Sequence, residues 1–246
     1  MTPAQVEEFK SVAIRAYPNE AGAVVFGDRL FVLPNVSPTP QEAMEFDGKV
    51  LTQLELAHGP MKAMIHSHII DQTKMANPMN RREPNWASSQ DMRTWFAVKV
   101  PFGIVATDGE GCGEVLWYDD NNRAPLLGRT FSHGLHDCYS VIRDAFLFEY
   151  GIDLPNYIRT YDWWNAGEDL YSDNFADAGF IEIPREKAKK GDVLLYKIGT
   201  AVPNHAAFLV DDQCIVHHLI DRQSRVEPRQ KWSRCEHIAL RHSSFL

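Results

Sequence analysis

The stretch "DCYSVIRDAFLFEYG", residues 137–151, predicts the strongest helix in the second half of the chain. Its apolar residues recur at helical spacing and form one stripe: Val141, Ile142, Ala145 and Phe146. Gly151 stands where helices commonly end in a glycine with left-handed backbone. We therefore expect a helix that begins at Cys138 and ends just before Gly151.

Beyond this helix the sequence changes to a succession of strand patterns. A polar stretch rich in aromatic residues, 156–180, is expected to form a loop and a second helix. Four strand-like runs follow: "DVLLYKI" (192–198), "HAAFLV" (205–210), "QCIVHHL" (213–219) and "HIALRH" (237–242). A helix followed by a run of antiparallel strands is the α+β pattern, which we expect for the second half of the chain.

In the first half of the chain, helices and strands alternate. Residues 2–18 predict a helix because Thr2 suits the N-cap and apolar residues recur at helical spacing. Residues 88–98, "SSQDMRTWFAV", predict another helix with Ser88 as its N-cap. Strand-like runs surround them: "GAVVFG" (22–27), "RLFVLPN" (29–35), "KAMIHSH" (62–68), "FGIVAT" (102–107) and "EVLWY" (114–118). Interleaved helices and strands predict an α/β domain.

The stretch "YDDNNRAPLLGR", residues 118–129, has the composition of a loop between these halves. Charged residues, two asparagines and a proline follow an apolar run there. We expect a boundary near 119–127, with one domain over residues 1–120 and a second over 126–246. A chain of 246 residues is long enough for two cores of ordinary size.

Composition narrows the class of protein. Hydrophobic residues make up 44% and charged residues 24%, which is typical of a folded globular protein. The formal net charge of -8 argues against a nucleic-acid partner, which would require a clustered basic surface. No apolar run approaches the roughly 18 residues of a transmembrane helix, and the acidic, amphipathic N-terminus does not resemble a secretory leader. Four cysteines without C-x-x-C spacing are expected to be free thiols.

The pair His66 and His68 opens a first candidate site. Side chains two apart on a strand share a face, so these imidazoles can supply two nitrogen ligands to zinc. The pair alone fits two half-buried strand histidines better than it fits a metal site. Asp91, one turn into the following helix, is a suitable third ligand, and Ser88 lies on the same side of that turn. Glu20 is the candidate for the carboxylate that takes a proton from zinc-bound water.

The set Glu20, "HSH" and "SSQD" resembles the JAMM (MPN) zinc metallopeptidase domain, which has a cytidine-deaminase-like fold. The resemblance covers most of residues 1–118. It implies that His66, His68 and Asp91 bind Zn²⁺, that Glu20 is the general base and that Ser88 donates to the oxyanion. The stretch 69–87 between His68 and Ser88 is longer than the family's usual spacing, and we expect it to cap or reshape the substrate groove.

Cys138 opens a second candidate site. At a helix N-terminus the macrodipole and free N–H groups favour a thiolate, so a lowered pKa is expected for Cys138. An imidazole base and a group that orients it are then needed. His205 and His217 suit facing positions on a hairpin closed around "DDQ" (211–213). A cysteine that only fills space is the alternative, and we assign it to the remaining three: Cys112, Cys214 and Cys235.

The order "DC", "GIDLPN", "GDVLLY", "NHAAFLV", "VHHL" resembles the NlpC/P60 cysteine peptidases, papain-like enzymes of bacterial cell-wall turnover. The resemblance spans roughly residues 126–246. It implies Cys138 as nucleophile, His205 as base and His217 as the group that orients His205. His218 points to the opposite face of the strand. The upstream tyrosine that often completes the family's oxyanion hole is not evident in "PLLGRTFSHGLH", so the second oxyanion donor is left unassigned.

The combination of the two domains resembles the tail-tip assembly proteins of lambda-like phages. That resemblance implies a virion-associated hydrolase whose substrate is bacterial peptidoglycan, cut at the γ-D-glutamyl–diamino acid bond, and whose partners are phage tail-tip proteins. It implies a location in the host cytoplasm during assembly, then at the virion tail tip, with action at the host cell wall or periplasm. Two alternatives are a structural assembly factor with idle sites and a JAMM-dependent processing protease for a tail protein.

Overall fold

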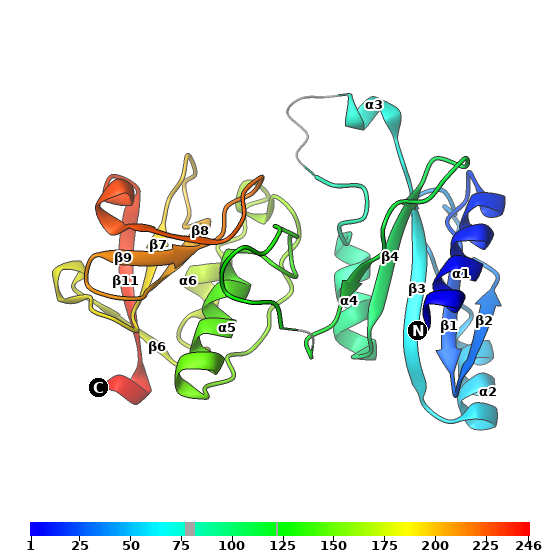
Figure 1. The fold of residues 1–246 in the computed structure, drawn as a ribbon, viewed down its shortest axis with the longest axis horizontal. Helices are drawn as coiled ribbons and strands as arrows, with labels where there is room; N and C mark the ends of the chain where they lie inside the picture. The colour runs from blue at the N-terminus through cyan, green and yellow to red at the C-terminus, as the bar shows by residue number, and fades with distance from the viewer. Residues whose placement is uncertain (77–81, 122) are drawn as a thin grey trace. The chain divides into compact units, whose positions relative to one another are not determined.

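The computed structural model describes residues 1–76, 82–121 and 123–246. The chain divides into two compact units, Met1–Asn121 and Asn122–Leu246 (Figure 1). Each unit has its own sheet and its own buried core, so each is described by itself. In the described parts of the chain, no helix combines the length and the apolar character that crossing a membrane requires.

The N-terminal unit is built on a five-stranded sheet with the order β2-β1-β3-β4-β5. Its strands are β1 (Gly22–Phe26), β2 (Arg29–Leu33), β3 (Met61–Ile69), β4 (Phe102–Thr107) and β5 (Leu116–Tyr118). β3 and β4 pair in parallel, so the chain between them has to return to the starting end of the sheet. The other pairs are antiparallel.

The described helices of this unit are α1 (Pro3–Ala16), α2 (Gly48–His58), α3 (Gln72–Met75) and α4 (Ser89–Val98). α1 packs its buried residues, Phe9 and Ala13, against Ile65 of β3. Because side chains alternate along a strand, His66 and His68 share one face of the sheet, and Ile65 lies on the other face. They face α4, whose Asp91 meets both imidazoles.

The C-terminal unit has a six-stranded antiparallel sheet with the order β10-β9-β8-β7-β11-β6. The strands are β6 (Phe180–Ile183), β7 (Val193–Tyr196), β8 (His205–Leu209), β9 (Cys214–His217), β10 (Arg225–Pro228) and β11 (Glu236–His242). α5 (Cys138–Tyr150) packs its apolar stripe on one face of this sheet, against Ala206 and Phe208 among others. The remaining helices are short: α6 (Leu170–Asn174), η1 (Trp163–Asn165), η2 (Arg185–Lys187), η3 (Arg229–Trp232) and η4 (Ser243–Phe245).

The register of the β8–β9 hairpin differs from the expected one. His217 pairs with Ala207, so His205 and His217 are diagonal neighbours and do not stand directly opposite each other. Residues two apart on a strand share a face, and diagonal neighbours remain within reach of long side chains. The two imidazoles therefore meet despite the shift.

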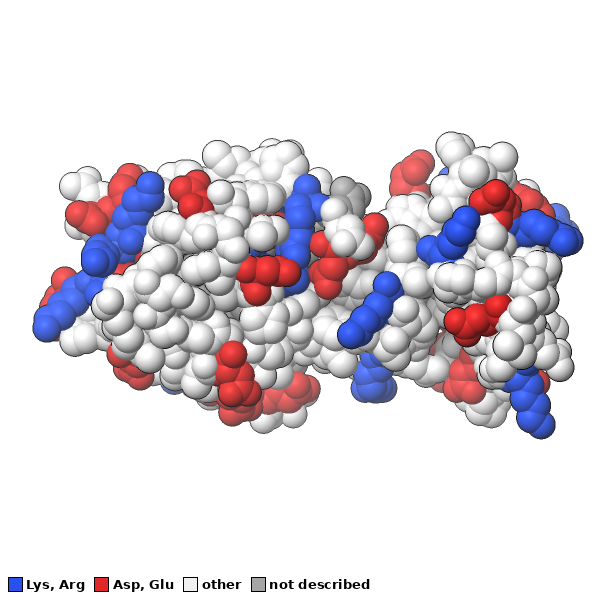
Figure 2. Space-filling model, turned by 90° about the horizontal axis from the view of Figure 1, so that it is seen from below, with Lys and Arg blue, Asp and Glu red and all other residues white. Residues whose placement is uncertain are grey.

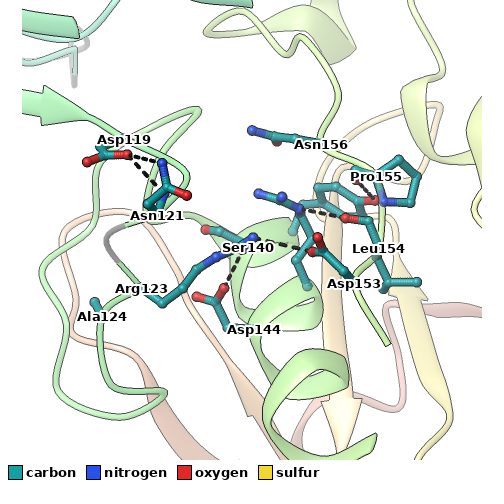
Figure 3. Close-up of polar contacts among 12 residues, drawn as sticks. Asp119, Asn121, Arg123, Ala124, Ser140, Asp144, Asp153, Leu154, Pro155 and Asn156 are labelled. Atoms are coloured by element: carbon teal, nitrogen blue, oxygen red, sulfur yellow. Dashed lines mark hydrogen bonds and ion pairs between the residues drawn. The ribbon is translucent and has the colours of Figure 1, made fainter. Parts of the chain in front are cut away.

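Arg123 anchors the beginning of the C-terminal unit on α5 (Figure 3). Its guanidinium pairs with Asp144 at 2.8 Å and with Asp153 at 3.4 Å. Arg129 pairs with the other oxygen of Asp144 at 2.6 Å. Because Asp144 is buried, the two guanidinium groups offset the cost of removing its charge from water. The segment that leads into α5 is thereby held against the helix that carries Cys138.

Charged side chains of both signs are interspersed on the face that Figure 2 presents. Apart from a short run at the left edge of that view, the basic side chains on that face are separated from one another by acidic or uncharged surface. A protein that binds a phosphate backbone typically gathers its basic residues into a patch or stripe. The visible face has no such continuous basic stripe among the residues described.

Candidate functional site

The start of α5 is fixed by a buried carboxylate. Asp137 is the N-cap residue, and its side chain accepts a hydrogen bond from the backbone N–H of Ser140 at 3.0 Å. The Arg159 guanidinium pairs with the same carboxylate at 2.6 Å. Burial alone would raise the pKa of Asp137, but the Arg159 charge holds it well below its ordinary value. Cys138 therefore occupies a rigidly positioned first turn.

The sulfur of Cys138 lies in a closed environment. Its Sγ is 3.1 Å from the hydroxyl oxygen of Tyr171, and the backbone amide of Ala206 in β8 also faces it. Burial, and secondly the charge of Asp137, raises the pKa of the Cys138 thiol to about 11. The expectation of a lowered pKa was wrong, because loss of water around the sulfur outweighs the effect of the helix N-terminus.

The two histidines form one hydrogen-bonded pair. His205 Nε2 lies 3.0 Å from His217 Nδ1, and both rings are buried. The ring of Trp232 covers them, with centroids 6.1 Å from His205 and 5.0 Å from His217. Burial, and secondly the neighbouring His217, lowers the pKa of His205 well below its ordinary value. The base is therefore neutral at rest.

Cys138 and His205 form no hydrogen bond with each other in the described chain. The sulfur instead meets the backbone of Ala206, the residue that follows His205. Catalytic hydrogen bonds are often long in proteins without substrate and tighten when substrate binds. Cys138 and the histidine pair thus lie at the same end of β8, without a direct hydrogen bond between Cys138 and His205 in the described structure.

Two residues beside this site were not predicted from the sequence. Tyr171 comes from α6, inside a stretch that gave only a loop-and-helix expectation. Glu227 lies on β10, and its Oε2 is 3.3 Å from Nε2 of His217. The alternation in "RVEP" (225–228) is the only local signal for that strand, and it does not reveal which strand lies beside it. His218 faces away, as expected, and its Nε2 donates to the carbonyl of Arg222 at 3.1 Å.

The first candidate site also assembles. One ligand atom each from Glu20, His66 and His68 lies within 4.8 Å of the others. Asp91 adds its carboxylate, with Oδ1 3.1 Å from His66 Nε2 and Oδ2 3.0 Å from His68 Nε2. Although burial would raise it, the two histidines hold the pKa of Asp91 well below its ordinary value. An anionic oxygen pair therefore lies between two imidazoles.

Ser88 and Asp91 have a second, purely structural relationship. The Ser88 side chain accepts from the backbone N–H of Asp91 at 3.2 Å, and Asp91 Oδ2 accepts from the backbone N–H of Ser88 at 2.7 Å. This reciprocal arrangement is a capping box at the start of α4. The S-x-x-D pattern would therefore occur here even without a metal. Any indication of a metal site has to come from the histidines.

The histidines do favour a cation. His66 Nε2 is buried and has no hydrogen-bond partner among the described residues, despite its closeness to Asp91. His68 Nδ1 lies 2.7 Å from the carbonyl oxygen of Pro84, which can only accept, so Nδ1 carries a proton. In neutral His68 the lone pair is then on Nε2, toward Asp91. Burial lowers the pKa of His68, but the hydrogen bond and charge of Asp91 outweigh it and raise that pKa, so a cation is favoured beside the carboxylate. Two imidazole nitrogens converging on an ionised carboxylate are a donor set that fits a zinc ion in place of that proton.

Glu20 is held beside these groups by the neighbouring backbone. The Ala21 N–H donates to Ser67 Oγ at 2.9 Å, and the Ser67 N–H donates to the Ala21 carbonyl at 2.9 Å. Ser67 stands between the two histidines in β3 and points to the other face. Burial raises the pKa of Glu20 above its ordinary value, with the histidines opposing the shift.

Comparison with known proteins agrees with the geometry of the C-terminal unit. Residues 128–239 match the model of the NlpC/P60 family. Tail tip assembly protein K of Escherichia phage lambda is 41% identical over 121 residues, 49% of this chain and 60% of the lambda protein. Tail tip assembly protein K of Escherichia phage N15 is 25% identical over 229 residues, 91% of this chain and 87% of that protein.

Solved structures with similar chains include the NlpC/p60 domain of the peptidoglycan hydrolase SagA. It has 18% identity and a TM-score of 0.35, over 47% of this chain and 88% of that one. An NlpC/P60 family protein from Bacillus cereus has 11% identity and a TM-score of 0.35, over 94% of this chain and 66% of that one.

The C-terminal unit therefore contains the region that matches the NlpC/P60 family. About half of the chain is similar to the tail tip assembly protein K of phage lambda, and the weaker similarity to the N15 protein extends across both units. The aligned segment spans 60% of the lambda protein's length. The JAMM interpretation of the N-terminal unit stays a prediction.

Proposed function

We propose that the C-terminal unit is a cysteine endopeptidase with Cys138 as nucleophile, His205 as base and His217 as the group that orients His205. The observation that carries the proposal is the position of the sulfur. It lies half-buried at the first turn of α5, against the end of β8 that presents the His205–His217 pair. A nucleophile, a base and an orienting group in this order are the elements of acyl transfer.

In the proposed reaction, Nδ1 of His205 accepts the proton of Cys138 as Sγ bonds to the scissile carbonyl carbon. When the C–N bond breaks, His205 returns the proton to the leaving nitrogen. Water then attacks the thioester, one of its protons passes through His205 to the sulfur, and a carboxylate product leaves. Because both side chains are neutral at rest, this route separates charge only when substrate is present.

Two donors are available for the oxyanion. The backbone N–H of Cys138 is at the first helical position, where no intrahelical acceptor exists. The hydroxyl of Tyr171, 3.1 Å from the sulfur, is our candidate for the second donor. A donor so close to the attacking atom is well placed for an oxygen that develops charge one bond away.

We propose peptidoglycan stem peptides as the substrate and the γ-D-glutamyl–diamino acid link as the bond. The NlpC/P60 match and the tail-tip naming of both relatives support this assignment. A tail protein would meet other tail-tip proteins in the host cytoplasm during assembly. It would then act from the virion tail tip at the cell wall or periplasm of the next host.

Digestion of purified sacculi tests the enzymatic proposal. The full chain should release peptide fragments whose masses identify the cut bond, and Cys138→Ala should release none above buffer. Cys214→Ala is the matched control, because that cysteine lies at the start of β9 and is expected to leave activity unchanged. Equal release by wild type and Cys138→Ala would eliminate Cys138 as the nucleophile.

A structural assembly factor with idle sites is the competing function. It predicts that phages carrying Cys138→Ala or Asp91→Ala assemble tails and infect normally, whereas removal of either unit abolishes tails. Processing of a tail protein at the first site predicts an uncut precursor in Glu20→Ala virions, visible by mass spectrometry. Only the peptidoglycan hydrolase predicts assembled Cys138→Ala particles that fail at wall penetration.

For the N-terminal unit we propose one zinc ion held by His66, His68 and Asp91, as in the JAMM domains that it resembles. The observation that supports it is the convergence of Nε2 of His66 and Nε2 of His68 on the Asp91 carboxylate, at 3.1 and 3.0 Å, with no well-formed hydrogen bond at the buried His66 nitrogen. Bound zinc would acidify a water molecule and polarise a carbonyl. Glu20, whose pKa is raised by burial, is the proton acceptor of this set, and Ser88 is the proposed oxyanion donor.

Elemental analysis of the purified full chain tests the metal. About one zinc per chain is expected for wild type and close to none for His66→Ala with His68→Ala. His58→Ala is the control, because His58 ends α2 and contacts Phe31 away from this cluster. Equal zinc in the double variant and wild type would remove these histidines as ligands.

A further inference from the structure

Hydrogen-bond donors surround the carboxylate of Glu227 in the described structure. Lys231 Nζ lies 2.8 Å and Arg225 Nε 3.0 Å from Oε1, while Trp232 Nε1 donates to Oε2 at 2.8 Å. His217 Nε2 is 3.3 Å from that same Oε2. Although burial opposes it, the hydrogen bonds from Lys231 and Trp232 lower the pKa of Glu227 to about 2. Glu227 is therefore a carboxylate that can only accept.

An acceptor at this position determines where the protons of the histidine pair lie. Because Glu227 cannot donate, Nε2 of His217 carries the proton that faces it. Neutral His217 then has its lone pair on Nδ1 and must accept from Nε2 of His205, 3.0 Å away. Neutral His205 in turn keeps its lone pair on Nδ1, the nitrogen that has to receive a thiol proton.

We propose that Glu227 is a positioning residue of the cysteine site, which fixes the tautomers of His217 and, through it, of His205. The chain of acceptors runs from Glu227 to His217 to His205 and ends in a base with a free Nδ1. The inference rests on the proposed cysteine peptidase function for its consequence. The proton positions themselves do not depend on any activity.

Packing around Glu227 suits this role. Its side chain is only 9% exposed, and Trp232 both donates to it and covers the two imidazole rings. The cations on Oε1 are on the solvent side, with Lys231 and Arg225 side chains 55% and 42% exposed. One oxygen of the carboxylate is thus held by exposed cations, and the other is directed at the buried histidine.

The variant Glu227→Gln should reverse the proton positions. The two cations on Oε1 favour the amide oxygen on their side and outweigh the single neutral donor on Oε2, the indole N–H of Trp232, which then loses its acceptor. This orientation directs the amide NH₂ toward His217 Nε2. A donor there forces the proton of His217 onto Nδ1, which then donates to Nε2 of His205. His205 is left with a proton on Nδ1 and no lone pair for the thiol.

Long-range ¹H–¹⁵N spectra of the full chain with ¹⁵N-labelled histidine test the proposal. In wild type, both His205 and His217 should be protonated on Nε2, and in Glu227→Gln both should be protonated on Nδ1. Glu227→Ala, which lacks either group, should give mixed tautomers. Glu236→Gln is the control, since that carboxylate pairs with Arg229 at 3.0 Å, and its spectrum should match wild type.

Wild-type His217 protonated on Nδ1, or unchanged tautomers in Glu227→Gln, would overturn the proposal. On sacculi, Glu227→Gln should lower kcat about tenfold or more with KM little changed, as wrong-tautomer variants of catalytic histidines do. Loss of activity with wild-type tautomers would also count against it. Correct tautomers in a wild-type chain that cuts no peptidoglycan would instead refute the proposed function and leave the positioning role standing.

Discussion

At the scale of single residues, the hydroxyl of Tyr171 is the most direct test of how the cysteine site handles charge. It lies 3.1 Å from the sulfur and belongs to a phenol whose pKa burial raises well above its ordinary value, so it stays a donor. Tyr171→Phe should lower kcat about 10²-fold with little change in KM, because the donor acts in the transition state. Kinetics on a purified muropeptide measure both constants.

Tyr157→Phe is the matched control, since that hydroxyl donates to the Asn174 carbonyl at 3.4 Å. It should retain activity within about twofold. A Tyr171→Phe enzyme as active as this control would exclude Tyr171 as an oxyanion donor.

The raised pKa of Cys138 predicts how its reactivity changes with pH. A thiol with a pKa of about 11 is protonated at neutral pH, so its thiolate fraction should grow about tenfold per pH unit until that value is approached. Alkylation by iodoacetamide, followed for the Cys138 peptide by mass spectrometry, should therefore accelerate steadily from pH 7 to 10. A rate already constant at pH 7 would indicate a preformed thiolate–imidazolium pair instead.

The positions of candidate site residues were predictable where the signal is local. Cys138 follows an N-cap aspartate and His205 opens a strand, so each is recognisable from its own neighbours in sequence. Tyr171 and Glu227 reach the site through the path of a loop and the pairing of β10 with β9, which no local pattern encodes. Asp91 illustrates the opposite difficulty, because its S-x-x-D spacing also describes a capping box.

At the scale of elements, the stability of α5 depends on Asp137, which both caps the helix and neutralises Arg159. Asp137→Asn keeps a capping oxygen but leaves a buried guanidinium uncompensated, a loss of about 3 kcal/mol in the free energy of unfolding. Asp137→Ala also removes the cap and should lose about 1 kcal/mol more. Urea unfolding of the C-terminal unit, followed by tryptophan fluorescence, measures both.

The same pair predicts an acid dependence. The folded-state pKa of Asp137 is depressed below the ordinary 3.8, so its stabilising effect is complete above that value and is lost as pH falls below it. The stability difference between wild type and Asp137→Asn should therefore be constant from pH 5 to 7 and shrink toward pH 2. A difference that is the same at every pH would show that the Arg159 pair does not contribute.

Helices and strands were predictable in proportion to the apolar surface that they bury. The helices that carry clear apolar stripes, α1, α4 and α5, begin and end within a residue or two of the expected positions. α2 was missed because none of its residues is fully buried and its apolar side is narrow: Val50, Leu51 and Leu54 are half-buried, whereas Leu56 is 84% exposed. β6 and β10 were missed because each is four residues long and at a sheet edge, where alternation is weakly imposed.

At the scale of the whole molecule, two separate cores predict two separate unfolding events. Phe9 and Ile65 are in the core of one unit, and Phe146 and Phe208 are in the core of the other. Calorimetry of the full chain should therefore resolve two transitions. Asp137→Asn should lower the midpoint temperature of only one transition, which identifies that transition as the unfolding of the C-terminal unit.

Zinc should then raise the unfolding temperature of the N-terminal unit alone. A ligand at about a thousand times its Kd stabilises the unit that binds it by about 4 kcal/mol, and the C-terminal unit offers no comparable cluster among its described residues. His66→Ala should abolish the shift, whereas Cys138→Ala should retain it in full, because the cysteine belongs to the other core. A zinc shift of both transitions would mean that the units unfold as one. If zinc shifts neither transition of the wild type, the zinc site is excluded, and Asp91 is only a helix cap between two histidines.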